Sequence, residues 1–414
     1  MRVGEVANSD AVIHGKPLDG VRVLALEQMQ ALPFATQLLA RLGADVVKVE
    51  NPDGGESARG ALPTIVDPGG RPVGATFLRN NLGKRSIAID VKQDAGRDLV
   101  LELVPRFDVV AENFRAGTLD RLGLGYGPVA AVHPAVIYVS TSGFGSGPSP
   151  YSDWPAYASI VEAMSGIYDF MSRPGETPRA NPVGALGDIT AALFATIGVL
   201  AALRHRDRTG EGQRVEVAML DAVVAMTDLV MNFASLGQPH IPYPPASIIE
   251  TFRARDGWFV MQLVREHQFE RLARVIGRPE WITDSRLATR EGWGLHLDDV
   301  LRPGIEAWSS GLTKLEAASA LTAAGVASGP CHSATEVIDD PHLAARHMIV
   351  EMPRPDGGGP PVLIPGNPVK LSKMAEGPET RVPWLGEHTA AVLRAEVGLE
   401  DDQLAELERR GVIG

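Results

Sequence analysis

Short apolar runs alternate with helical segments through the first half of the chain, and this alternation limits the fold more than any other feature. Strands are expected at 21–27, 44–50, 86–91, 108–112 and 135–140, and helices at 33–42, 95–106 and 117–122. A strand, a helix and a second strand in succession normally form a right-handed crossover between parallel strands. The pattern predicts an open, doubly wound α/β domain with ligands beyond the carboxyl ends of its strands.

The composition changes after the strand and helix expected at 214–219 and 220–236. Residues 237–247 include four prolines and resemble a linker, and 251–263 is typical of a β-hairpin that turns at Asp256–Gly257. Helices are expected at 266–277 and 312–325. This region therefore predicts a second, smaller α+β domain. The long segment 51–83, rich in Gly and Pro, is expected to be a loop.

A single acidic residue, Asp188, stands between a loop rich in Gly and Pro that begins at Asn181 and an apolar helix that runs to Leu203. The free N–H groups and the positive dipole end at the start of a helix stabilise a carboxylate. Asp188 can therefore be a helix N-cap, since Asp is a preferred capping residue, or it can carry chemistry. This stretch alone leaves both interpretations open.

Charge and cysteine content narrow the class of protein. The 51 acidic and 39 basic residues give a net charge of -12, which argues against nucleic acid or an anionic membrane as a partner. Cys331 is the one cysteine, so no internal disulfide can form, as suits a reducing cytosol. The first twenty residues lack a continuous apolar core, and the apolar run 191–203 is shorter than the ~20 residues of a membrane span. We expect a cytoplasmic protein.

Several common catalytic motifs are not matched. The glycines of 143–147 follow a strand, but Pro148 comes next and the GxGxxG spacing is not met, so nicotinamide binding is not expected. We interpret this segment as a bent active-site loop. The sequence contains no GxSxG motif, so a serine hydrolase is not indicated. The spacing of His332, His342 and His347 does not match a metal site, so no metal is expected.

Several segments, taken in chain order, resemble the class III (CaiB/BaiF type) coenzyme A transferases. These segments are 21–60, 81–91, 112–123, 183–221, 329–348 and 385–389. The resemblance implies a Rossmann-like large domain built from both ends of the chain, a small middle domain and a homodimer of interlocked, ring-like subunits. The corresponding bounds are 1–225 and 330–414 for the large domain and 226–329 for the small domain with its linkers.

The same resemblance implies a catalytic role for two residues. The segment 184–188 is similar to the one that holds the nucleophilic aspartate of the family, so Asp188 is expected to attack the thioester of an acyl-CoA and form an acyl-aspartyl anhydride. Gln30 stands where some members have an active-site glutamine, although Leu32 replaces a glycine of that run. The expected partners are an acyl-CoA and a carboxylic acid, with no permanently bound cofactor. The glycine loops 143–147 and 184–187 are candidate oxyanion donors.

For coenzyme A, the resemblance points to five residues: Lys92, Asn113, Phe114, Arg121 and Tyr157. Basic side chains would meet phosphates, and aromatic rings would flank the adenine or the pantetheine arm. Some relatives have basic residues near Asn51 and Pro155. Because neither residue is basic here, the phosphate contacts are expected to move to Arg59, Lys84, Arg85 or Arg115.

Two alternative functions compete with transfer. A 2-methylacyl-CoA racemase shares the fold and the aspartate, but it pairs that aspartate with a histidine, and the corresponding run 154–159 contains none. The other alternative is a CoA-binding protein without catalysis. Formyl- and oxalyl-type members have a glycine-rich lid, whereas 237–250 is rich in proline. A larger or dicarboxylic acyl group is therefore expected.

Overall fold

The computed structural model describes residues 1–172, 176–180, 184–227, 230–240, 245–355 and 357–414; Asn181 and the start of the resembling segment at 183 lie outside them. The chain divides into two compact units. Unit 1 comprises Met1–Tyr168, Ala180–Asp228 and Pro341–Gly414, and unit 2 comprises Asp169–Arg179 and Leu229–Asp340. The sequence-based bounds 1–225, 226–329 and 330–414 remain a prediction.

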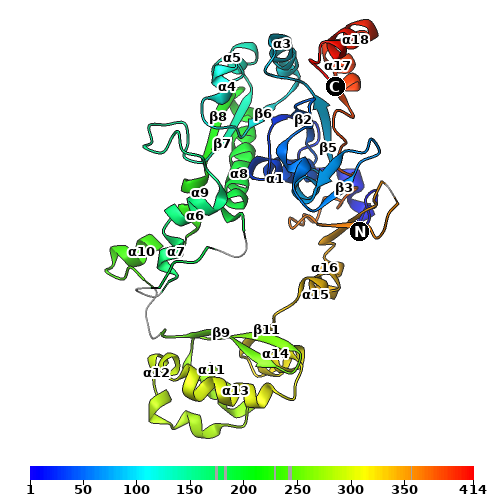
Figure 1. The fold of residues 1–414 in the computed structure, drawn as a ribbon. Coiled ribbons are helices and arrows are strands. Elements are labelled where there is room, and N and C mark those ends of the chain that lie inside the picture. Colours follow the sequence, from blue (N-terminus) through cyan, green and yellow to red (C-terminus); the bar gives the residue numbers. More distant parts are fainter. Residues whose placement is uncertain (173–175, 181–183, 228–229, 241–244, 356) are drawn as a thin grey trace. The chain divides into compact units, whose positions relative to one another are not determined.

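Unit 1 is built on a six-stranded parallel sheet, as the strand and helix alternation predicts (Figure 1). The strands are β1 (Arg22–Leu26), β2 (Asp45–Glu50), β5 (Lys84–Ala88), β6 (Val109–Glu112), β7 (Ile137–Ser142) and β8 (Gln213–Ala218). Their order is β5-β2-β1-β6-β7-β8. The chain reverses its direction across the sheet between β1 and β6, where Leu26 is in register with Glu112. Such a switch point is where doubly wound sheets bind ligands.

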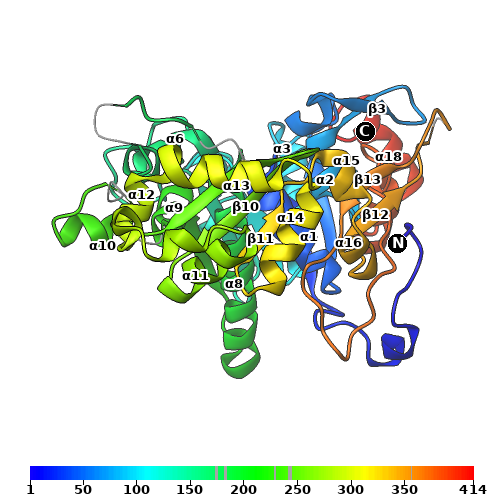
Figure 2. The same cartoon turned by 90° about the horizontal axis from the view of Figure 1, so that it is seen from below.

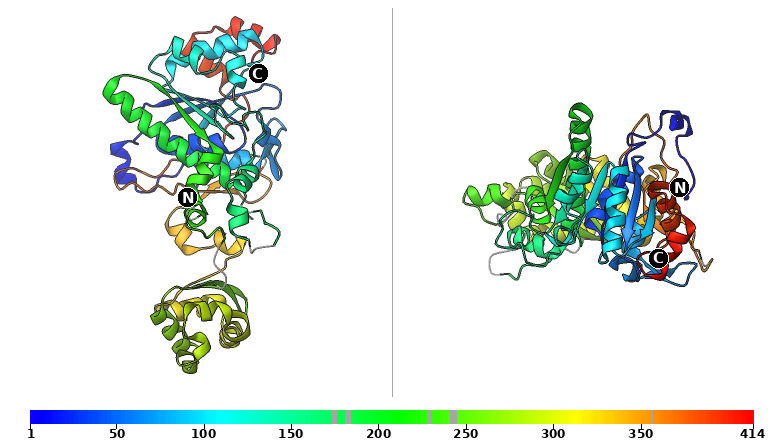
Figure 3. Two further views of the ribbon diagram at one scale, coloured as in Figure 1. Left: turned by 90° about the vertical axis from the view of Figure 1, so that its left-hand side faces the viewer. Right: turned by 90° about the horizontal axis from the view of Figure 1, so that it is seen from above.

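Helices cover both faces of this sheet, because alternate strand residues point in opposite directions. Leu24 packs with one group of helices, and its neighbours Val23 and Ala25 pack with the other. The first group is α3 (Asp94–Leu103), α5 (Tyr126–Val132), α17 (Thr389–Val397) and α18 (Asp401–Arg409). The second group is α1 (Ala31–Arg41) and α8 (Leu186–Thr209), and α8 lies along its face of the sheet (Figure 3).

The segment 51–83 is not the plain loop that its composition predicts, because part of it packs into a hydrophobic cluster of its own. It forms η2 (Ser57–Gly60), β3 (Thr64–Val66), β4 (Pro72–Gly74) and α2 (Ala75–Asn80). The remaining elements of unit 1 are η1 (Ser9–His14), η3 (Val104–Arg106), α4 (Thr118–Arg121), α6 (Ala158–Met164), α9 (Met219–Met226), α16 (Pro341–Ala345), β12 (Ile349–Met352) and β13 (Val362–Pro365), and α7 (Ile167–Phe170) includes the unit boundary.

Unit 2 contains the expected hairpin, in which β9 (Ile248–Ala254) and β10 (Gly257–Leu263) pair antiparallel and β11 (Ala327–Pro330) adds a third strand. Helices cover one face of this sheet (Figure 2), and Phe269 stacks on the buried ring of Trp293. Its other elements are α10 (Val230–Ser235), α11 (Glu266–Val275), η4 (Pro279–Ile282), η5 (Ser285–Leu287), α12 (Arg290–Leu295), the π-helix η6 (Leu297–Leu301), α13 (Arg302–Ser309), α14 (Lys314–Ala323) and α15 (Ala334–Ile338).

The helix α8 is longer than the apolar run 191–203 and, by length and composition, could span a membrane. Half of its most apolar window is buried inside the protein. Its buried side chains, which include Ala195 and Val199, pack against the sheet. The core helix of a globular protein has these same properties.

A buried cluster of charges connects the carboxyl ends of β1 and β2 with β5. It contains three carboxylates and three cations, namely Glu27, Glu50, Glu56, Lys48, Arg59 and Lys84. Lys84 Nζ donates to Glu27 Oε1 at 2.7 Å, and Arg59 donates to both oxygens of Glu50 at 2.6 and 2.7 Å. Burial by itself raises the pKa of Glu27, but Lys84 and Lys48 together hold it below its ordinary value.

Removing one charge from this cluster is expected to destabilise unit 1 strongly, because a buried ion without its partner is costly. Glu27→Gln keeps the side-chain shape and leaves Lys84 without its closest carboxylate. The free energy of unfolding, measured in urea, should fall by about 3–5 kcal/mol. The exposed pair Arg394–Asp401 provides the control, since Asp401→Asn should leave the unfolding midpoint unchanged. Equal midpoints for the two variants would contradict this account.

Candidate functional site

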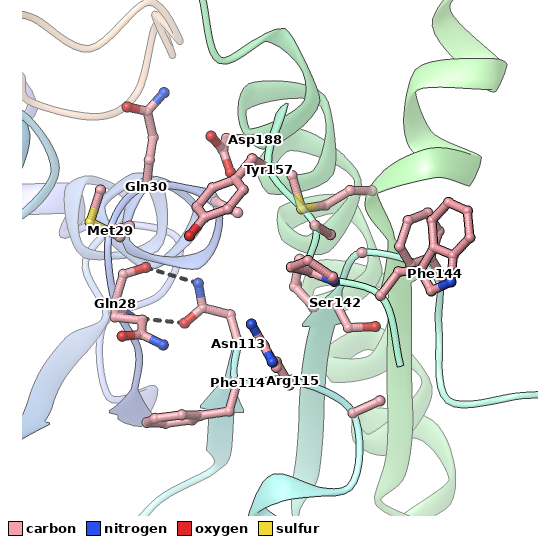
Figure 4. Close-up of a pocket in the computed structure, with 18 of the residues that line it drawn as sticks. Gln28, Met29, Gln30, Asn113, Phe114, Arg115, Ser142, Phe144, Tyr157 and Asp188 are labelled. Carbon is pink, nitrogen blue, oxygen red and sulfur yellow. Dashed lines mark hydrogen bonds between the residues drawn. The ribbon is translucent and has the colours of Figure 1, made fainter. Parts of the chain in front are cut away.

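A cavity of about 580 Å³ lies in unit 1 at the carboxyl ends of β1, β6 and β7 (Figure 4). The turn after β1, the loop after β6 and the loop 142–157 form its walls, and the start of α8 closes it. The residues that line the cavity include Gln28, Met29, Gln30, Asn113, Phe114, Arg115, Phe144, Trp154, Tyr157 and Asp188. The cavity thus occupies the switch point of the sheet.

The turn after β1 is held in a conformation that is uncommon for its residues. Met29 has a backbone φ of 62°, a left-handed value that residues other than glycine rarely adopt. Asn113, directly after β6, accepts from the Gln28 N–H at 2.8 Å and donates to the Gln28 carbonyl at 2.9 Å (Figure 4). The Met29 N–H donates to Glu56 Oε2 at 2.9 Å. The buried charge cluster and Asn113 therefore fix this turn from two sides, and Gln30 follows it as the N-cap of α1.

Asp188 lies in the first turn of α8, with its side chain at the cavity (Figure 4). Ala185 precedes the helix in a left-handed conformation, with φ of 55°, and its side chain cannot cap the helix. Gly187 has no room for a side chain, because a Cβ there would lie 2.7 Å from Val161 Cγ2 and 3.0 Å from Ala158 Cα. The start of α8 thus packs directly on α6.

Burial, and then the negative charge of Glu162, raise the pKa of Asp188 to about 6. The ordinary value for an aspartate is about 3.9, so Asp188 is a more basic carboxylate than most. At pH 7 about nine tenths of it is still ionised. A partly buried carboxylate with a raised pKa in a cavity is a typical candidate for catalysis.

Five of the predicted site residues line the cavity together: Gln30, Asn113, Phe114, Tyr157 and Asp188. Both polar groups of the Asn113 amide are used on the Gln28 backbone, so this side chain has a structural task that its sequence position did not indicate. Lys92 and Arg121 do not line the cavity. Both are exposed, and Arg121 Nη2 donates to Thr118 Oγ1 at 3.2 Å.

The expectation that phosphate contacts move to other basic residues is wrong for two of the four candidates. Arg59 and Lys84 are buried in the charge cluster and cannot reach a phosphate. Arg85 is bound to Asp45, with Nε donating to Oδ1 at 2.9 Å. Arg115 lines the cavity, and within the described part of the chain its guanidinium has no ion-pair partner.

The glycine loops are less available for oxyanion binding than their composition suggests. The Gly187 N–H donates to Glu162 Oε1 at 3.1 Å. The Gly145 N–H donates to Ser142 Oγ at 3.1 Å, and the Ser146 N–H donates to Glu216. Gly143 and Gly145 line the cavity, as an active-site loop would.

Glu162 is the residue of this site that the sequence analysis missed. It is 1% exposed, on an α6 that is otherwise mainly apolar on its buried side. An acidic residue directly after Val161, on the buried face of a helix, is the signal that could have identified it. Charged side chains are rarely fully buried unless they are paired or functional.

Comparison with known proteins shows the family to which the chain belongs. The model of the family described as CoA-transferase family III matches residues 18–389. The chain belongs to CoA-transferase family III. As a member of this family it is an enzyme of CoA transfer.

This family III CoA-transferase is similar over its length to curated relatives. It is 36% identical to the formyl-CoA:oxalate CoA-transferase of Streptomyces avermitilis, over 96% of this chain and 100% of the relative. It is also 36% identical to the succinyl-CoA–D-citramalate CoA-transferase of Chloroflexus aurantiacus, over 96% of this chain and 98% of the relative. A crystal structure of a CAIB/BAIF family protein from Brucella suis matches with a TM-score of 0.81 and 32% identity, over 92% of this chain and 99% of that one. The α/β fold expected from the resemblance is confirmed.

Proposed function

We propose that the enzyme moves CoA from an acyl-CoA to a carboxylic acid through an anhydride on Asp188. The supporting observation is the Asp188 carboxylate itself, placed at a helix start in a cavity and with a pKa raised to about 6. A carboxylate is a weak nucleophile, so greater basicity and fixed orientation both favour its attack. Gln30, Tyr157 and Asp188 lie on neighbouring parts of the cavity wall (Figure 4).

The steps balance without any external reagent. An Asp188 oxygen attacks the thioester carbonyl and the C–S bond breaks. The CoA thiolate departs, and an acyl-aspartyl anhydride has formed. The thiolate then attacks the Asp188 carbonyl and releases the first acid as a carboxylate. The acceptor carboxylate attacks the resulting aspartyl thioester, the C–S bond breaks, and a second anhydride forms as the CoA thiolate leaves. This thiolate then attacks the acceptor carbonyl of the anhydride, which gives the new acyl-CoA and restores the free Asp188 carboxylate. Water would hydrolyse these anhydrides, so it must be excluded.

The aromatic wall of the cavity suits a thioester and its pantetheine arm. Tyr151 packs on Phe144 and on Trp154, with ring centroids 5.6 and 4.9 Å apart, and this group fixes the loop beside Tyr157. Phe114 and Tyr157 are the proposed apolar contacts for CoA. Lys92 and Arg121 stay predicted phosphate contacts outside the cavity.

Incubation with succinyl-CoA should leave a hydroxylamine-sensitive acyl group on Asp188, detected by mass spectrometry. Asp188→Asn, which preserves side-chain shape, should form no adduct and lose at least ~1000-fold in rate, because the nucleophile is removed. Transfer by Asp188→Asn at the wild-type rate would exclude the mechanism. Loss of the α-proton to deuterated water without transfer would instead indicate the racemase, and neither reaction a CoA-binding protein.

We further propose that one of the acids is dicarboxylic. The free acids in the names of three relatives are oxalate, D-citramalate, succinate and glutarate, and each of them is dicarboxylic. Among the cavity-lining residues described here, Arg115 is the cation and Asp188 the anion. A guanidinium binds a carboxylate with two parallel hydrogen bonds, so Arg115 is the proposed partner of the distal carboxylate.

Arg115→Met should lower kcat/KM for succinyl-CoA by about 10–100-fold, the loss expected for a charge-assisted pair. The value for butyryl-CoA, which has the same chain length and no distal carboxylate, should not change. Arg208→Met, at the opposite end of α8, is the matched control for loss of one arginine. An equal loss with both thioesters would assign Arg115 to the CoA phosphates and overturn the carboxylate role.

We also propose that the enzyme is a homodimer, with the interlocked subunits that the family resemblance implies. The support is an apolar stripe on α8, formed by Leu193, Ile197 and Leu200, which are 42%, 60% and 37% exposed. Their spacing places them on one face of the helix. A contiguous apolar face of this kind is typical of a covered surface.

Sedimentation should therefore give twice the 44.1 kDa chain mass for the wild type. Ile197→Glu introduces a charge into the middle of the stripe and should shift the protein toward the monomer. Val132→Glu, on exposed α5 surface outside the stripe, should sediment as the wild type does. A monomeric wild type would refute the proposal.

A further inference from the structure

Among the described residues, the Glu162 carboxylate accepts two hydrogen bonds, one from the start of α8 and one from α7. Its Oε1 accepts from the Gly187 N–H at 3.1 Å, and its Oε2 accepts from the Tyr168 hydroxyl at 2.6 Å. The side chain comes from α6 and is buried. The carboxylate is therefore fixed at both oxygens, next to the residue that precedes Asp188.

The start of α8 needs this contact. The first N–H groups of a helix have no partner within the helix, and a side chain usually binds them. Ala185 cannot do so. Glu162 supplies the acceptor from the neighbouring helix, and the close packing of Gly187 on Ala158 and Val161 brings the helices near enough for it to reach.

We propose that Glu162 is a positioning residue for Asp188. Glu162 fixes the turn that presents the nucleophile, and its negative charge repels the Asp188 carboxylate. This inference rests on the proposed role of Asp188. As the anhydride forms, the negative charge leaves Asp188 for the thioester oxygen and then the thiolate. The repulsion between the two carboxylates is relieved along the reaction, so it acts on the ground state more than on the transition state.

Other elements that pack against α8 also carry charged residues, but these do not shift the pKa of Asp188 as Glu162 does. Arg41 on α1, Asp221 on α9, and Arg214 and Glu216 on β8 are all ionisable. Within the described residues, Glu162 is the charged group that shifts the pKa of Asp188, after burial itself. Like charge close to a carboxylate raises its pKa, and so does burial.

Two variants separate positioning from charge. Glu162→Gln retains an oxygen that can accept from the Gly187 N–H but removes the charge, and Glu162→Ala removes both. In the wild type, kcat/KM should rise with pH and level off above about 6, because Asp188 must be ionised to attack. In Glu162→Gln this rise should shift to lower pH by about one unit, with a small loss in kcat at pH 7.

Glu162→Ala should show the same shift together with a kcat loss of about 10–100-fold at nearly constant KM, because the turn loses its fixed orientation. Asp221→Asn, which removes an exposed carboxylate from neighbouring α9, should keep the wild-type profile and is the control for net charge. Wild-type pH profiles and kcat values in both Glu162 variants would overturn the inference. A profile shifted equally in Asp221→Asn would also overturn it.

The pKa of Asp188 can be measured without any catalysis, which separates this inference from the proposed function. Protein labelled with ¹³C at aspartate carboxyl groups gives the titration directly, and Asp188→Asn assigns the signal. A signal that titrates lower in Glu162→Gln supports the contact even where no acyl adduct forms. An unchanged titration contradicts it even where Asp188 proves to be the nucleophile.

Discussion

The buried pairing of Glu27 with Lys84 and Lys48 is the contact on which the site depends. Ions taken out of water must be matched, so the strands that carry them are held in one arrangement. The same cluster includes Glu56, which binds the Met29 N–H and so keeps the turn after β1 in its left-handed form. The position of Gln30 follows from that turn. An electrostatic requirement deep in the sheet thus sets the geometry of the cavity wall.

A second carboxylate performs the corresponding task on the neighbouring part of the cavity wall. Glu162 binds the backbone at the start of α8, as Glu56 binds the turn after β1. In both places a buried acid from another element satisfies an N–H that its own segment cannot. The cavity is therefore lined by backbone whose conformation is set from behind, which leaves the side chains of Gln30 and Asp188 directed toward the ligand space.

The sheet could be predicted from sequence because its strands are short apolar runs between helices, a local pattern. Asp188 could be placed at a helix start for the same reason. The structure of 51–83 could not be predicted, since it depends on buried ion pairs of Glu56 and Arg59 with residues of β2, which the composition of this segment does not indicate. Lys84 was expected to contact a phosphate, because nothing in the neighbouring sequence indicates its pairing with Glu27. Glu162 was missed because capping is usually sought in the preceding residues, not on another helix.

The strand β5 is covered by a part of the chain that follows it by about three hundred residues in the sequence. The Ala88 N–H donates to Thr389, and Val412 accepts from Asp90, while Ile413 joins the cluster around Ile87. All of unit 2 is synthesised between these partners. During synthesis, the apolar surface beside β5 is therefore exposed until residues 389–413 have left the ribosome. The covering of this sheet is thus a late event in synthesis, and the apolar surface exposed until then is of the kind that chaperones protect.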